Sequence, residues 1–366
     1  MINHPLMKNN ITQADLKKVI NFLKKNPILT QSKKVEEFEK KWSKWLGIKY
    51  SVFVNSGSSA NFISLKVLKI LKKNPKEIIV PTLTWVSDIV SVIDSGFKPI
   101  FVDIDFSNLS MSTEKIIKKI NKNTQAVFLT HAQGFNALSE KLLKVLKKRK
   151  ISLIEDCCES HGATFKNKKI GTYGLMSNFS FYYAHHLSTI EGGMICTNNK
   201  EIYEICRMLR GHGLLREAKD QKFKLSISRK YKDLSKEFIF MYPGYNMRSN
   251  EISAVIGINQ LKRLDSNNKR RAKNLNFYLS LLDTKKYLVD YDIVGASNYA
   301  FPLILKKDYK KLSKKLEQLM KKNNIEFRRG NAGGGNQLRQ PYLKSFKKNN
   351  KLEEFKHVEH VHFYCY

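Results

Sequence analysis

The segment FSFYYAHHLSTIEGG, residues 179–193, contains two adjacent histidines ahead of a Glu-Gly-Gly sequence. An imidazole has an ordinary pKa of about 6.5, so it can accept a proton and return it near neutral pH. His185 is therefore a candidate base and acid. His186 is adjacent and would point elsewhere, and we interpret it as structural.

The segment NSGSSAN, residues 55–61, lies between a strand-like run and a helix start. Exposed backbone N–H groups and the positive end of the helix dipole at such a place bind anions. Gly57 and Ser58 are therefore candidate phosphate ligands. Small residues also occur in ordinary turns, and this alternative stays open.

An acid and an aromatic residue follow two further strand-like runs. In LIEDCCES, residues 153–160, Asp156 can pair with a protonated pyridine nitrogen, which makes the ring a better electron sink, or it can cap a helix. In PTLTWVSD, residues 81–88, Trp85 can stack on a flat ring or lie in the core.

These residues need a framework, and the first 210 residues or so alternate strand-like runs with helical patterns. This alternation predicts an α/β fold with a mainly parallel sheet covered by helices, whose ligands bind at the carboxyl ends of the strands. We expect a helix ended by Gly47 from the spacing of Val35, Phe38, Trp42, Trp45 and Leu46. We expect strands at YSVFV, EIIVP, KPIFVDID, QAVFLTH, ISLIED and GMICTN.

The length of 366 residues favours two domains. Residues 214–240 form a polar, charged excursion, after which a helix resumes at NEISAVIGINQLKRL. We expect a large domain of residues 1–264 that contains this insertion, and a smaller α+β domain of residues 265–366.

The formal net charge is +34, which first suggests nucleic acid as a partner. The lysines, however, are spread at spacings that place them on the solvated faces of amphipathic helices, and no nucleic-acid module is recognisable. We therefore expect no nucleic-acid partner. A positive field that gathers an anionic substrate is a secondary interpretation.

No run approaches the roughly 18 apolar residues of a membrane helix, and the start MINHPLMKNN lacks an apolar signal core. We expect a cytoplasmic protein without a membrane partner. The five cysteines are odd in number and lack CxxC spacing, which favours free thiols over a disulfide framework or a metal site.

Taken in order, these motifs and YPGYNMRSNEISAVIGINQL, residues 242–261, resemble the DegT/DnrJ/EryC1/StrS family of fold-type-I enzymes. The resemblance extends from about residue 28 to about residue 345. It implies an aminotransferase-like fold, pyridoxal phosphate (PLP) as cofactor, and a homodimer with active sites at the subunit interface.

The resemblance also implies where the cofactor phosphate lies. By position, Gly57 and Ser58 would bind it, with help from Ser180. Asn246, in the sequence GYN, would reach the phosphate from the neighbouring subunit.

The same resemblance implies contacts to the ring and the substrate. Trp85 would lie over the pyridine ring, Asp156 would hold its nitrogen, and Glu159 would lie near the ring hydroxyl. His212, in RGHG, would lie near the active site. Arg328 would contact a diphosphate or the carboxylate of glutamate, for which a guanidinium is suited, although a surface arginine is an alternative.

Aminotransferases of the family have the pattern F-S-F-x-x-x-K, and His185 occupies the lysine position here. No lysine lies between residues 170 and 199, so the primary amine that normally anchors the cofactor is missing. The pattern AHHLSTIEGG is similar to the small histidine-bearing branch of the family, the sugar 3-dehydratases.

This branch implies pyridoxamine phosphate (PMP) as the working cofactor, L-glutamate as its amine source, and loss of the C3 hydroxyl from a nucleotide-linked 4-keto-6-deoxy sugar, with GDP as the nucleotide. An iron–sulfur version is disfavoured because residues 207–364 contain no cysteine. The implied setting is the synthesis of surface-polysaccharide sugars. Two alternatives stay open: an aminotransferase that uses a distant lysine, and a PLP-binding relative without catalytic activity.

Overall fold

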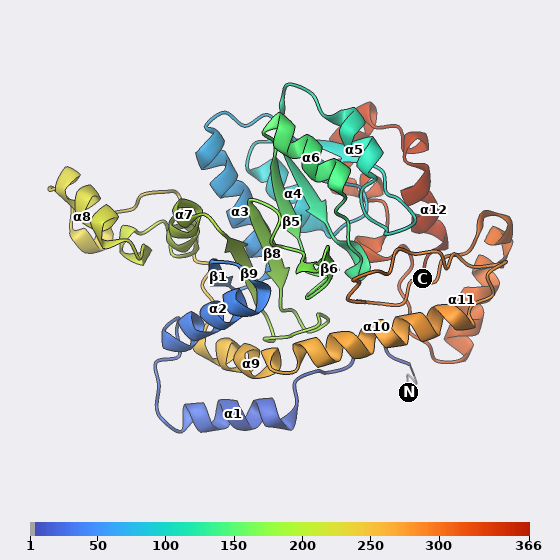
Figure 1. Cartoon of the computed structure of the whole chain (residues 1–366), viewed down its shortest axis with the longest axis horizontal. Coiled ribbons are helices and arrows are strands. Elements are labelled where there is room, and N and C mark those ends of the chain that lie inside the picture. Colours follow the sequence, from blue (N-terminus) through green and yellow to red (C-terminus); the bar gives the residue numbers. More distant parts are fainter. Residues whose placement is uncertain (1–3) are drawn as a thin grey trace.

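A seven-stranded sheet forms the centre of the computed structural model, which describes residues 4–366 (Figure 1). Its order is β1-β9-β8-β5-β4-β2-β3. Only β9 runs antiparallel to its neighbours, so the predicted mainly parallel α/β sheet is confirmed. The strands are β1 (Tyr50–Val54), β2 (Glu77–Pro81), β3 (Lys98–Val102), β4 (Thr124–Thr130), β5 (Ser152–Asp156), β8 (Met176–Ser180) and β9 (Gly193–Thr197). A separate hairpin joins β6 (Thr164–Phe165) to β7 (Lys168–Lys169).

Helices cover both faces of the sheet, and the strand residues alternate between two hydrophobic clusters. Ile78 and Val80 pack on one face, and Ile79 between them packs on the other. The first face is covered by α3 (Gly57–Lys72), α4 (Val86–Asp94) and α7 (Lys200–Arg210). The second is covered by α2 (Lys33–Leu46), α5 (Thr113–Lys119), α6 (Glu140–Arg149) and α9 (Glu251–Leu261), and α1 (Gln13–Leu23) packs against α9.

Helix ends follow the expected local chemistry. The predicted helix α2 ends at Gly47, whose φ of +86° is the left-handed conformation that glycine adopts most readily. Helix α3 begins after Ser56, whose Oγ accepts a hydrogen bond from the backbone N–H of Ser59 at 3.0 Å. The predicted helix α9 begins in the same way after Asn250.

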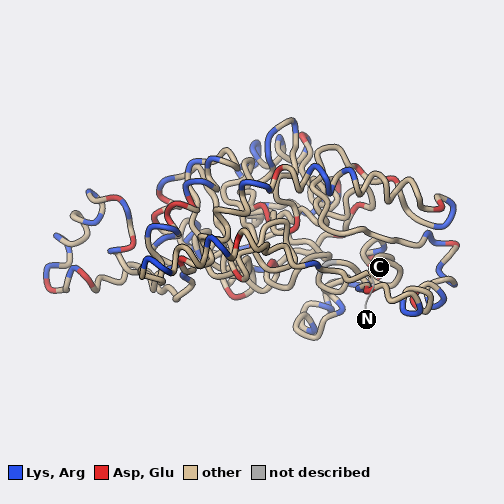
Figure 2. Tube along the Cα trace, turned by 90° about the horizontal axis from the view of Figure 1, so that it is seen from below, with Lys and Arg blue, Asp and Glu red and all other residues tan. Residues whose placement is uncertain are grey.

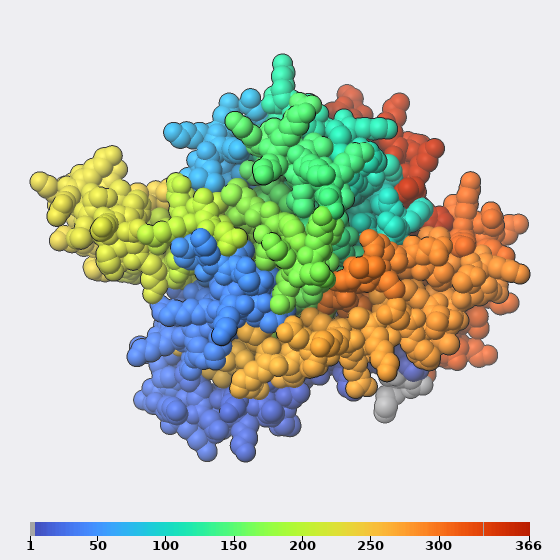
Figure 3. Space-filling model, viewed as in Figure 1, coloured from blue at the N-terminus to red at the C-terminus, as the bar shows by residue number. Residues whose placement is uncertain are grey.

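The excursion at residues 214–240 projects from the body of the protein (Figures 1 and 3). It contains a helix that the sequence analysis did not predict, α8 (Gln221–Lys230), none of whose residues is buried. Helix α8 therefore adds no buried residue, whereas Leu215, Ala218 and Ile239 at the two ends of the excursion belong to the core of the sheet domain.

The C-terminal part is mostly helical, with α10 (Leu264–Leu281), α11 (Ser313–Lys322) and α12 (Lys356–Tyr364). Within the described residues, strand pairing after residue 264 is limited to bridges such as Tyr287 with Leu305 and Ile304 with Cys365. Several of its apolar residues join the core of the sheet domain, while Leu305, Met320 and Tyr366 form a small cluster of their own. The division at residue 264 stays a prediction.

Lysine and arginine are spread along the whole trace, with acidic residues among them (Figure 2). Many are solvent-exposed, as in the pair Lys141–Glu114. No helix in residues 4–366 has the length and apolarity required to cross a bilayer.

Candidate active site

The start of α3 and the end of β8 meet at the carboxyl edge of the sheet. A Cβ added to Gly57 would lie 2.5 Å from the Cβ of Ser180 and 3.0 Å from its Oγ, so only glycine permits this approach. Gly193, from the Glu-Gly-Gly sequence, packs equally closely against the peptide between Ser56 and Gly57. Gly57, Ser58 and Ser180 are thus neighbours around free N–H groups at a helix start, which suits an anion.

Asp156 ends β5 and lies on the sheet face that α3 and α4 cover, on the same side as Ile154. Its side chain is 4% exposed. Its Oδ1 accepts a hydrogen bond from the backbone N–H of Cys158 at 2.8 Å, and its Oδ2 accepts one from Asn61 at 3.1 Å. Asp156 therefore closes a local turn and does not cap a helix.

A second carboxyl group, that of Asp88 on α4, lies beside Asp156 and was missed in the sequence analysis. Asn61 donates to it at 2.7 Å, and Thr130 donates at 2.5 Å. Complete burial and the neighbouring Asp156 raise the pKa of Asp88 well above its usual range. The sequence feature that could have identified Asp88 is its position one helical turn after Trp85.

His185 is half-buried, and its Nδ1 is a buried atom without a hydrogen-bond partner within the described chain. Burial lowers its pKa to about 4; the nearby carboxylate of Asp156 opposes this and the charge of Arg271 adds to it. Its ring lies 5.4 Å from that of Tyr299 and 5.9 Å from that of His161. The imidazole is therefore uncharged at neutral pH.

His186 points to a different partner, as expected for a structural residue. Its Nε2 lies 2.9 Å from the backbone oxygen of Ser297, and its side chain is 4% exposed. The two adjacent histidines thus have different environments.

Glu159 accepts a hydrogen bond from the backbone N–H of Gln133 at 2.8 Å. Burial raises its pKa to about 7, and the neighbouring Asp156 contributes in the same direction. Burial raises the pKa of the Tyr299 hydroxyl, the charge of Glu159 raises it further, and the charge of Arg328 lowers it. Tyr299 was also not predicted from the sequence. Residues distant in sequence therefore converge beside His185.

Trp85 precedes α4 and is 57% exposed, which excludes the alternative of a core tryptophan. Asn246 and His212 are also exposed. In the described chain, the side chain of Asn246 accepts only from the backbone N–H of Arg248, at 3.4 Å, and no hydrogen bond joins Asn246 or His212 to Gly57, Ser180 or His185. The single chain thus brings together Gly57, Ser58, Ser180, Asp156, Glu159 and His185. Within the described residues, no hydrogen bond joins Trp85, Arg328, Asn246 or His212 to this group.

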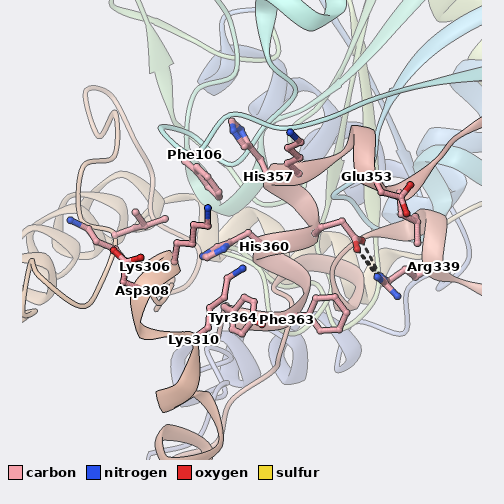
Figure 4. A pocket seen from close by; sticks show the side chains of 15 residues that line it. Phe106, Lys306, Asp308, Lys310, Arg339, Glu353, His357, His360, Phe363 and Tyr364 are labelled. Atoms are coloured by element: carbon pink, nitrogen blue, oxygen red, sulfur yellow. Dashed lines mark hydrogen bonds and ion pairs between the residues drawn. The ribbon is translucent and has the colours of Figure 1, made fainter.

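A cavity lies away from these residues. It measures about 750 Å³ and is formed around α12 and the segment at 306–310 (Figure 4). Lys306, Lys310 and His360 project into it, but none of the predicted site residues lines it. The cavity is therefore not the site of the predicted chemistry.

His131, Glu155 and Cys157 offer potential metal-ligand atoms close together on the opposite face of β5. Glu155 already accepts hydrogen bonds from the backbone N–H groups of Gly171 and Gly174 at 2.8 and 2.6 Å. The His131 ring bonds to Glu155 at 3.3 Å through Nε2 and accepts from a backbone N–H through Nδ1. This group is occupied by internal bonds and needs no ion.

A model of the DegT/DnrJ/EryC1/StrS aminotransferase family matches residues 9–360. The chain belongs to this family. The predicted family and fold are confirmed.

Individual members resemble the chain over most of its length. GDP-4-keto-6-deoxy-D-mannose 3-dehydratase of Escherichia coli O55:H7 is 36% identical over 333 residues, which is 90% of this chain and 85% of the relative. A structure of the E. coli enzyme with bound hydrated PLP has a TM-score of 0.86 and 30% identity, covering 100% of this chain and 94% of that chain. Another structure of such a dehydratase, with a trapped PLP–glutamate geminal diamine, has a TM-score of 0.83 and 30% identity, with coverage of 99% and 94%.

Proposed function

We propose that the protein is a PLP/PMP-dependent 3-dehydratase of a GDP-linked 4-keto-6-deoxy sugar, with L-glutamate as amine donor. The observation that supports this most directly is His185, a half-buried and neutral imidazole at the position where family aminotransferases have lysine. The relative with 36% identity is a 3-dehydratase, and related structures bind PLP and a PLP–glutamate adduct.

The residues present fit such a cofactor. Gly57 and Ser180 frame a helix start with free N–H groups, which would hold the phosphate together with Ser58. Asp156 would accept a hydrogen bond from the ring nitrogen, and the exposed Trp85 would cover the ring. When bound, the cofactor supplies an amine that reacts with the sugar ketone and a ring that accepts electrons.

His185 would remove a proton next to the reacting amine and return a proton to the departing C3 hydroxyl. A base must be uncharged before it acts, and burial keeps His185 neutral above about pH 4. Its unpartnered Nδ1 leaves a nitrogen free for this transfer. Lysine would instead tether the cofactor covalently, which would favour amination over dehydration.

Glu159 would act next to the ring. With a pKa of about 7, it holds a proton at mildly acidic pH and can donate a hydrogen bond to an oxygen of the ring. The charges of Arg328 and Glu159 both shift the pKa of the Tyr299 hydroxyl. This supports a role for Arg328 in binding an anionic part of the substrate or the carboxylate of glutamate.

We also propose a homodimer in which Asn246 and His212 complete the site of the partner. Both are exposed, and within the described chain neither forms a hydrogen bond to Gly57, Ser180 or His185. The five free cysteines support a reducing compartment, and we infer the cytoplasm. Sugars deoxygenated in this way serve in surface polysaccharides, which is the setting we propose.

Product analysis tests the function. The purified protein is incubated with PLP, glutamate and GDP-4-keto-6-deoxy-mannose, and the nucleotide sugars are identified by mass spectrometry. We expect a product that has lost the C3 oxygen, with 2-oxoglutarate and ammonia formed in equal amounts. A nucleotide-linked amino sugar would refute the proposal, and a reaction without glutamate serves as the control.

A further inference from the structure

Two carboxyl groups meet behind the proposed ring site, and one of them has no assigned role. Asp88 is fully buried and Asp156 is 4% exposed. The side-chain nitrogen of Asn61 lies 2.7 Å from an oxygen of Asp88 and 3.1 Å from an oxygen of Asp156. One amide therefore bridges both acids.

Within residues 4–366, no lysine, arginine or histidine forms an ion pair with Asp88 or Asp156, and His185, on whose pKa Asp156 acts, is neutral because burial lowers that pKa to about 4. The other titratable groups whose charges interact with Asp88 are the thiol of Cys158 and the hydroxyl of Tyr342, and neither supplies a positive charge. Two ionised carboxylates that accept from the same amide in a buried site would repel each other strongly. The pair therefore shares one proton.

Burial indicates which acid keeps the proton, because it disfavours the charged form and Asp88 is fully buried, whereas Asp156 is 4% exposed at the edge of the sheet. An ionised carboxylate offers about four lone-pair positions. Asp156 receives N–H groups of Asn61 and Cys158, and its remaining positions can accept a proton from Asp88 and one from a ring nitrogen. In Asp88, Asn61 donates to Oδ1, and the hydroxyls of Thr84 and Thr130 donate to Oδ2.

We propose that Asp88 is a positioning residue: a carboxylic acid that stays neutral at neutral pH and donates its proton to Asp156, which thereby remains the single anion facing the ring nitrogen. The proposal rests on the proposed function only in assigning the ring nitrogen to Asp156. A pair with one negative charge neutralises one protonated ring, whereas two charges would leave an uncompensated buried anion.

Infrared spectroscopy of the cofactor-free protein tests the protonation directly. Aspartates are labelled with ¹³C at the side-chain carboxyl, which separates their bands from those of Glu159 and other glutamates. We expect a C=O stretch of a neutral carboxylic acid at pH 7.5 in the wild type. Its absence from the wild-type protein would overturn the proposal without the use of any variant.

Variants assign the band. Asp88→Asn should remove it, and Asp156→Asn should also remove it, because Asp88 then ionises with the hydroxyls of Thr84 and Thr130 and the amide of Asn61 as donors. The exposed Asp94, on the same helix, provides the control Asp94→Asn, which should leave the band unchanged. A band that persists in either Asp88→Asn or Asp156→Asn would contradict the pairing.

A second measurement follows the stability of the same cofactor-free proteins. Since the pKa of Asp88 is raised in the folded state, its contribution is most favourable below its unfolded pKa and is lost as pH rises. Between pH 4 and pH 8, Asp88→Asn should therefore gain stability relative to the wild type. A difference independent of pH would contradict the proposal, and neither measurement depends on dehydratase activity.

Discussion

Glu155 and Asp156 are consecutive acids at the end of β5, yet the pleat turns them to opposite faces of the sheet. Glu155 accepts from the backbone N–H groups of Tyr173, Gly174 and Gly171 at 2.9, 2.6 and 2.8 Å, and it also contacts His131. Asp156 accepts from one backbone N–H and one amide, and lies beside a second acid.

Two neighbouring carboxyl groups thus have different roles, one structural and one functional, because their surroundings differ. The hydrogen-bond donors around Glu155 occupy its acceptor positions, so this acid stabilises the loop at residues 171–174 against the sheet. Asp156 has lone-pair positions to spare at the edge where Gly57 and Ser180 meet. We therefore expect substitutions on the sheet face of Glu155 to reduce stability, and substitutions on the sheet face of Asp156 to reduce cofactor binding and turnover.

The largest effect is expected at His185, on the Asp156 side. His185→Asn removes the proton-transferring group and should lower kcat by a factor of about 10²–10⁴. Cofactor affinity and melting temperature should change little. Steady-state kinetics with the GDP sugar, together with a cofactor titration, provides the check.

The adjacent His186 supplies the matched control. His186→Gln keeps a side-chain N–H that can reach the backbone oxygen of Ser297, so kcat of the folded fraction should stay near the wild-type value. Equal losses of kcat at both histidines would show that the segment acts only through its fold.

Asp156→Asn should weaken cofactor binding by roughly one to two orders of magnitude, because a charge-assisted hydrogen bond contributes about 1.5–3 kcal/mol. Equilibrium dialysis of PLP against the cofactor-free protein measures this. Unchanged affinity would remove the assignment of the ring nitrogen to Asp156.

Glu155→Gln should show the opposite pattern. It weakens several backbone hydrogen bonds in a buried site, so the free energy of unfolding should fall by about 2–4 kcal/mol. The affinity of the folded protein for PLP should stay within about twofold of the wild type. Denaturant unfolding and dialysis of the same preparation separate the two effects, and a large loss of affinity would erase the contrast between the acids.

A smaller effect is expected from pH. The folded pKa of His185, about 4, lies below the unfolded value of about 6.5, so its contribution to stability is lost as pH falls through this window. The difference in unfolding free energy between the wild type and His185→Asn should therefore shift toward the variant from pH 6.5 to pH 4. A difference that stays constant would mean that His185 is solvated.

The smallest effect is expected far from both acids. Leu225 on α8 is 56% exposed, and Leu225→Ser should change the free energy of unfolding by no more than about 0.5 kcal/mol. Thermal unfolding is the check, and a larger change would show that the side chain of Leu225 packs against the protein rather than lying in solvent.

Much of this arrangement could be predicted from the sequence. The apolar runs predicted six of the seven strands of the sheet, all but β8, and the motif order predicted the family. The motifs also named Gly57, Asp156, Ser180 and His185, because special chemistry requires particular residue types after particular strands. These residues are adjacent in space because parallel strands end at one edge.

Other partners could not be predicted, because they depend on tertiary distances. Asp88 and Asn61 come from different helices, and their meeting with Asp156 depends on how α3 and α4 pack on the sheet. Tyr299 approaches His185 from the C-terminal part of the chain. An isolated acid or tyrosine in a sequence gives no periodic or spacing signal of this kind.

The central claim is that no lysine tethers the cofactor and that His185 takes its place. The PLP-loaded protein is reduced with borohydride, excess PLP is removed, and the intact protein and its peptides are weighed. The account predicts no stoichiometric phosphopyridoxyl group on any lysine, whereas a His185→Lys variant should acquire one at residue 185. A single stoichiometric adduct on a lysine of the wild-type protein would contradict the account and identify an aminotransferase.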